Sequence, residues 1–186
     1  TSRSTHDTIR SRSLTFFVPL NILPPSSSDA LAIISRGLMN HFVPTGCSED
    51  IRKTLEPIVK SLANGTVQVV QDVGLVFPAS SIARAFATMD LRKMVTLARR
   101  LCVVQGNEVL NKNEVVHLFL HEAREILCDA VMMPADRDTC LRQIATVSAN
   151  IFSSERERRN KRGMAILETR FLKHLHTLQF AEVPTS

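Results

Sequence analysis

The stretch from Val115 to Asp129, VVHLFLHEAREILCD, decides the fold. Its apolar residues recur at intervals of three and four, which places them on one face of an α-helix. Asn113 can cap this helix, and Pro134 would end it. The sequence therefore predicts a helix near 114–132, with Phe119 as a core anchor. Its apolar stripe comprises Val115, Val116, Phe119, Leu120, Ala123, Ile126, Leu127 and Val131.

The same helical spacing recurs on both sides of this stretch. It predicts further helices near 28–42, 49–72, 91–104 and 136–151, followed by a last apolar segment over 164–180. One apolar run, LTFFVPL over residues 14–20, is β-prone, and Pro19 restricts it to an edge strand or a strand end. No alternation of strands and helices is present, so a parallel sheet is not expected. The predicted class is an all-α bundle of five to six helices, with at most one or two short N-terminal strands.

Several residues mark where the predicted helices begin or weaken. The cluster from Ser26 to Asp29 offers N-caps for the first helix, Ser48 for the second and Asp90 for the third. Inside the second helix, Pro57 favours a kink and Gly65 lowers the helical propensity.

Composition excludes two broad classes of protein. The 186 residues are 44% hydrophobic and 22% charged, which is enough apolar material for a core and rules out disorder as the main state. No apolar run approaches the ~18–20 residues that a membrane-spanning helix needs. The chain has no Trp and no Tyr, so a nucleic-acid site built on aromatic stacking would be thin.

Positive charge gathers in one segment. The chain has a net charge of +5, and residues 153–163, SSERERRNKRG, hold five Arg or Lys against two Glu, which gives +3. We expect this segment to be a solvated basic loop. The alternative is a patch that binds phosphate or an acidic partner.

The cysteines and histidines form no complete metal or redox motif. Cys47, Cys102, Cys128 and Cys140 are too far apart for a C-x-x-C pair, so we expect reduced thiols, with Cys102 and Cys128 as small core residues. The histidines His117 and His121 share a helix face, but a third metal ligand is missing. His174 and His176 are predicted to lie at the surface or at its boundary.

Catalytic motifs are missing from the sequence as well. It contains neither a G-x-x-x-x-G-K-[ST] phosphate loop nor a G-x-S-x-G nucleophile elbow. The residues alone thus indicate a helical module without a catalytic site of its own.

Four blocks of sequence resemble dynein heavy chains, which are AAA+ motors. Residues 115–129 are similar to a helix with a Leu-Trp-x-His-Glu core, where Phe119 takes the place of Trp, and residues 136–138 match the acidic turn that follows. The block Met89–Met94 resembles Phe-Asn-Leu-Arg-Asp-Leu at the start of a lid helix. Residues 18–42 resemble the strand, Pro-rich turn and helix that lead into the lid, and residues 165–183 resemble the family's ending before the next module.

The resemblance implies a domain organisation. Residues 1–25 would be a flexible start and the end of an AAA+ large subdomain, and 26–152 the helical lid. Residues 153–163 would be the basic loop, and 164–186 would lead to the next module. The third AAA+ module of the ring matches best and the second is the alternative, while axonemal and cytoplasmic dyneins are not distinguished.

Functional residues are implied in the same way. Arg92 aligns with the sensor-2 arginine, which points from the lid toward nucleotide phosphates, and Arg10 or Arg12 lies where the family has its arginine finger. Two further positions near Arg92 depart from the family pattern: Lys93 replaces an acidic residue and Thr96 replaces an arginine. Neither catalytic residues nor metal ligands are expected, and ATP or ADP would be bound by the parent module but not by the isolated chain.

By this resemblance the chain helps to couple ATP binding and hydrolysis to movement along microtubules. Its partners would be the neighbouring AAA+ modules and, through the parent motor, microtubules and the dynein light and intermediate chains. It would reside in the cytoplasm and cytoskeleton, including a ciliary or flagellar axoneme, with no membrane or nucleic-acid partner. The alternatives are a non-enzymatic helical interaction domain that binds an acidic partner through its basic loop, and, more remotely, a metalloenzyme using His117 and His121.

Overall fold

The computed structural model describes residues 26–43, 46–77, 91–103, 112–128, 131 and 133–180. Those residues form helices and no strand, which confirms the predicted all-α class. The strand predicted over 14–20 lies outside the described residues. The helices are α2 (Ser27–Phe42), α3 (Glu49–Val76), α5 (Leu91–Leu101), α6 (Lys112–Leu127), α7 (Pro134–Phe152), α8 (Glu155–Arg158) and α9 (Lys161–Phe180).

Two of the predicted N-caps are confirmed. The Ser26 hydroxyl accepts a hydrogen bond from the Asp29 backbone N–H at 3.2 Å, and the Asp29 carboxylate accepts one from the Ser26 N–H at 3.2 Å. This reciprocal pair is a capping box, which satisfies backbone donors at the start of α2. The Ser48 hydroxyl accepts from the Ile51 N–H at the start of α3 in the same manner. The third predicted cap, Asp90, lies outside the described residues.

Other helix ends differ from the sequence prediction. The helix α6 begins at Lys112, so Asn113 lies within its first turn and is not its N-cap. It also ends at Leu127, earlier than predicted, and Val131 is buried beyond its end. Pro134 stands in the first turn of α7, where its missing N–H costs no hydrogen bond. The helix α3 continues past its predicted end at 72 to Val76.

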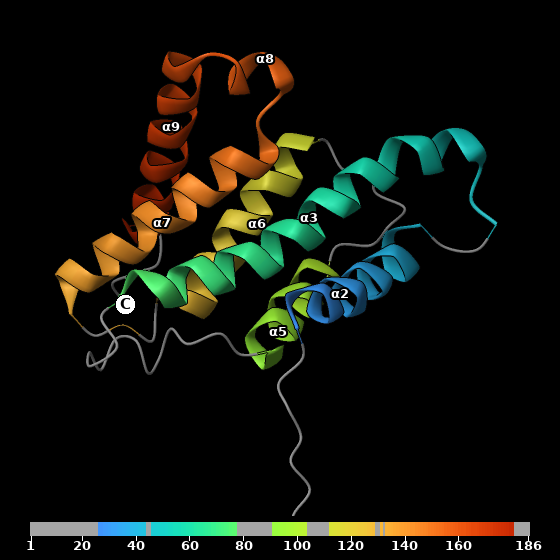
Figure 1. Cartoon of the computed structure of the whole chain (residues 1–186), viewed down its shortest axis with the longest axis horizontal. Helices are drawn as coiled ribbons and strands as arrows, with labels where there is room; N and C mark the ends of the chain where they lie inside the picture. Colours follow the sequence, from blue (N-terminus) through green and yellow to red (C-terminus); the bar gives the residue numbers. More distant parts are fainter. Residues whose placement is uncertain are drawn as a thin grey trace, which may run out of the picture.

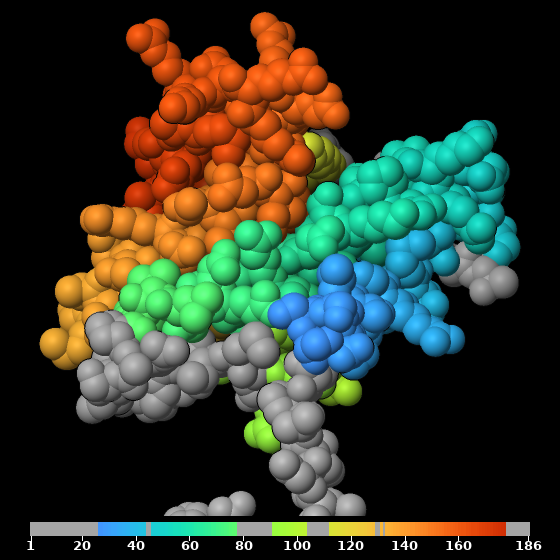
Figure 2. All heavy atoms as spheres, viewed as in Figure 1, coloured from blue at the N-terminus to red at the C-terminus, as the bar shows by residue number. Residues whose placement is uncertain are grey.

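The long helix α3 runs through the middle of the bundle (Figure 1). It packs against α2 on one side and α7 on the other, and it also contacts α5 and α6. The helix α9 packs against α7 and, less extensively, against α6. Figure 2 shows α2 lying along one side of α3, with α8 and α9 on the other side. Among the described residues, no helix has the length and apolar character required to cross a membrane.

The predicted core anchor is confirmed by its burial. Phe119 of α6 is fully buried, and its ring packs edge to face against Phe152 of α7 with centroids 5.2 Å apart. Gly65 of α3 provides the room: a Cβ placed there would lie 3.1 Å from the Phe119 ring and 3.6 Å from the Phe152 ring. The helix therefore keeps a residue of low helical propensity at this position because three helices meet there.

We expect Gly65→Val to lower the free energy of unfolding by about 1–3 kcal/mol, since its branched side chain would force the two Phe rings apart. Denaturant unfolding of both proteins measures this difference. Gly37 of α2 is a matched control, because nothing lies within 4 Å of a Cβ placed there. An equal effect of Gly37→Val would show that β-branching, and not the close packing at Gly65, is responsible.

The segment predicted as a basic loop is largely helical. Its first part forms the single turn α8, and α9 begins at Lys161. A second capping box, between Ser154 and Glu157, starts α8: the Glu157 carboxylate accepts from the Ser154 N–H at 2.7 Å, and the Ser154 hydroxyl accepts from the Glu157 N–H at 3.3 Å. The loop prediction rested on the run of charges and overlooked this S-x-x-E signature.

Candidate functional site

The structure places Arg92 at the second residue of α5, where its side chain is exposed. The buried face of α5 is formed by other residues, Met94, Leu97, Ala98 and Leu101. Arg92 therefore stands outside the packed face of the helix. The arginine-finger candidates Arg10 and Arg12 lie outside the described residues.

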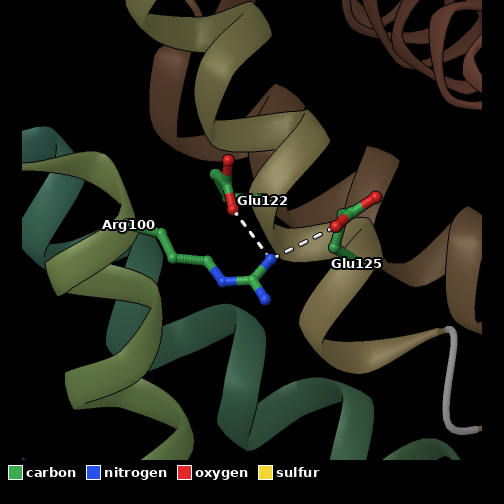
Figure 3. Close-up of polar contacts among 3 residues, drawn as sticks. All are labelled: Arg100, Glu122 and Glu125. Atoms are coloured by element: carbon green, nitrogen blue, oxygen red, sulfur yellow. Dashed lines mark hydrogen bonds and ion pairs between the residues drawn. The ribbon is translucent and has the colours of Figure 1, made fainter. Parts of the chain in front are cut away.

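The opposite end of α5 is tied to α6 by an arginine and two carboxylates. Arg100 Nη1 lies 3.2 Å from Glu122 Oε2 and 3.2 Å from Glu125 Oε2, so one nitrogen bridges both side chains (Figure 3). The two glutamate side chains are 15% and 27% exposed, whereas that of Arg100 is 45% exposed. Hydrogen bonding to Glu122, together with the charges of both glutamates, raises the pKa of Arg100 above its ordinary value.

This arrangement, here called the Arg100 bridge, fixes α5 relative to α6. Exposed ion pairs are screened by water and add little stability, so the bridge adds a specific polar contact to two helices that already pack through their apolar faces. Glu122 belongs to the His-Glu pair of the dynein-like pattern. The sequence offered no signal for the bridge, because it joins residues 22 and 25 positions apart.

A cluster of histidine side chains lies between α6 and α9. The rings of His117 and His174 have centroids 4.1 Å apart, and His121 lies one turn after His117 on α6. Desolvation, followed by the charges of His117, His121 and Arg170, lowers the pKa of His174. His174 and His176 are partly buried, which confirms their predicted boundary position. Within the described ranges, no group of three or more His, Cys, Asp or Glu could hold a metal ion.

The lowered pKa of His174 predicts that acid weakens the fold. Below the ordinary pKa of 6.5 the unfolded chain protonates this imidazole more readily than the native chain does, so the free energy of unfolding falls as the pH drops through that value. Thermal melts between pH 7.5 and 5 measure the effect. We expect His174→Gln to flatten this dependence. The same slope in the wild type and in His174→Gln would contradict the assignment.

The basic segment over residues 153–163 has only part of its positive charge available to bind a partner. Arg158 donates from Nε to the Ser153 hydroxyl at 3.1 Å and from Nη2 to the Ser153 carbonyl at 3.2 Å. Arg156, Lys161 and Arg162 are exposed, and Figure 2 shows long side chains projecting from the surface at this segment. The segment therefore combines an internal structural contact with an exposed positive surface.

Comparison of the chain with protein-family models, with curated protein sequences and with solved structures gives no match.

Proposed function

We propose that this chain is the helical lid of an AAA+ module in a dynein heavy chain. The observation that supports the proposal best is the arrangement of α5, which has an exposed arginine in its first turn and is fixed at its other end to α6. The helix α6 is also the one whose sequence most resembles the dynein pattern. An arginine held on a packed helix is suited to contact a phosphate, because it forms charge-assisted, bidentate hydrogen bonds.

The role of the lid follows from this arrangement. Arg92 would contact the phosphates of nucleotide bound between the large subdomain and the lid, as a fixed electrostatic group. The core residues of α5 and the Arg100 bridge join this arginine to the rest of the bundle. A rotation of the lid would then move Arg92 and α6 together, and the nucleotide state would be passed on to the neighbouring module.

The partners and location are part of the same proposal. ATP or ADP would bind to the parent module, whose partners would be the adjacent AAA+ modules, microtubules and the dynein light and intermediate chains. The motor would act in the cytoplasm and cytoskeleton, including a ciliary or flagellar axoneme. Arg10 or Arg12 would supply the arginine finger toward the neighbouring nucleotide.

The isolated chain is expected to show no ATP turnover above buffer and weak nucleotide affinity, since it lacks a phosphate loop. A coupled phosphate-release assay and a fluorescent-ATP titration measure the two properties. Steady turnover that survives Arg92→Ala would contradict the proposal. The coding sequence upstream provides a further test: a Walker A loop and a Walker B acid within the length of an ordinary domain are expected there.

The exposed positive surface favours a second candidate, a non-enzymatic domain that binds an acidic partner. Arg156, Lys161 and Arg162 would supply its charge. Such binding would weaken steeply with salt, because it releases counterions from the partner. Heparin-column elution of the wild type and of a triple alanine variant tests this candidate. Equal elution of the two would dismiss it and leave the lid proposal untouched.

A further inference from the structure

Two buried cysteines meet where α6 ends and α7 begins. Cys128 is the first residue after α6, and Cys140 lies in the second turn of α7. Their Sγ atoms are 2.7 Å apart, and both residues are fully buried within the hydrophobic core. The other two cysteines, Cys47 and Cys102, are only partly buried and lie beside other helices.

From this juxtaposition we infer that Cys128 and Cys140 are a redox modification site, which closes to an intramolecular disulfide when a small peroxide reaches it. The bonded sulfur distance in a disulfide is about 2.05 Å, so closure requires the two sulfurs to approach by roughly 0.6 Å. Such a shift is within the reach of side-chain adjustment. The inference concerns the bundle itself and is independent of the proposed nucleotide contact.

The chemistry balances with hydrogen peroxide as the oxidant. One cysteine sulfur, as its thiolate, attacks a peroxide oxygen; the O–O bond breaks, and the departing hydroxide leaves as water with the proton of that thiol. The second sulfur then attacks the resulting sulfenic acid, whose S–O bond breaks as the S–S bond forms. The departing hydroxide takes up the second thiol's proton. Two thiols and one peroxide thus give one disulfide and two waters.

The burial of both thiols limits which oxidant can reach them and how it enters. A fully buried thiol reacts only when the structure opens locally, and helix ends open more readily than helix centres. Cys128 follows the last residue of α6, and Cys140 is within two turns of the start of α7. Hydrogen peroxide is small and uncharged, so it can enter through an opening that excludes a bulky disulfide reagent.

The disulfide would join the residue that follows α6 to the second turn of α7. The two cysteines are 12 positions apart, so the bond closes a short ring and removes conformational freedom from the unfolded chain. The expected result is a rise in melting temperature of roughly 5–10 °C on oxidation. Because Glu122 and Glu125 lie on α6, the bond would connect α7 to the end of the helix that the Arg100 bridge joins to α5.

The experiment uses the full chain, reduced and then treated with hydrogen peroxide. We expect most molecules to lose about 2 Da, the mass of two hydrogens, and dithiothreitol to restore the original mass. Peptide mapping should find Cys128 joined to Cys140. The melting temperature should rise on oxidation and return on reduction, and the Cys47→Ala/Cys102→Ala variant should behave like the wild type.

Cysteine variants and peptide mapping show whether the disulfide forms between Cys128 and Cys140. Cys128→Ala and Cys140→Ala should each abolish the mass loss and the thermal shift, and mapping of the wild type remains decisive if either variant unfolds. Four unmodified thiols after peroxide treatment would overturn the inference. Cross-links that involve Cys47 or Cys102, or sulfinic acid at Cys128 or Cys140 without a bond between them, would overturn it as well.

Discussion

Replacement of Phe119 by alanine is expected to lower the free energy of unfolding by about 3–5 kcal/mol, which is the cost of emptying a fully buried aromatic site. The ring lies where α3, α6 and α7 meet, in contact with Phe152 and against Gly65. The backbone at Gly65 is held in a helix, so it cannot readily collapse into the space. Urea or guanidinium unfolding of the two proteins measures the loss.

The matched control for this change is Ile166→Ala on α9, because Ile166 is 69% exposed. Its removal should change the free energy of unfolding by less than about 0.5 kcal/mol. A Phe119→Ala protein as stable as the wild type would contradict the central position of Phe119, and with it the packing of α6 against α3 and α7.

Arg92→Ala in the parent module is expected to weaken ATP binding by about one to two decades and to leave the lid folded. A charge-assisted hydrogen bond to phosphate is worth ~1.5–3 kcal/mol, whereas the side chain contributes little to packing because it lies outside the buried face of α5. Nucleotide titration of the module measures the affinity, and a thermal melt of the isolated chain measures the fold.

Two further variants make this test specific. Arg99→Ala removes another exposed arginine from the same helix and should leave the affinity unchanged. Arg92→Lys should restore only part of the affinity, because lysine lacks the planar fork of a guanidinium. Equal affinity of Arg92→Ala and the wild type would make Arg92 an ordinary surface residue.

The longer helices could be predicted because each has an apolar face with helical period, and because Ser26 and Ser48 are caps that act within one turn. The predicted burial of Phe119 followed from the same periodicity. The continuation of α3 beyond residue 72 was missed, because Gly74 favours the end of a helix but here is buried within it. Local glycine propensity was outweighed there by tertiary packing.

Three side-chain contacts could not be predicted from the sequence, because each depends on how distant segments pack together. The Arg100 bridge and the pairing of His117 with His174 join side chains from different helices, and the third contact joins Cys128, just after α6, to Cys140 of α7. Their residue types are ordinary on a helical surface or in a core, and no spacing rule relates them. The short helix α8 is different, because its capping box is local and could have been recognised from Ser154 and Glu157.

The most direct test of the lid proposal is an experimental structure of the parent module with bound nucleotide. The proposal predicts the Arg92 guanidinium within hydrogen-bonding distance, about 2.7–3.2 Å, of a phosphate oxygen of the nucleotide in its own module. It also predicts that α5 and α6 remain joined by the Arg100 bridge. A structure in which the first turn of α5 faces solvent, with the nucleotide phosphates held entirely by other residues, would contradict the proposal.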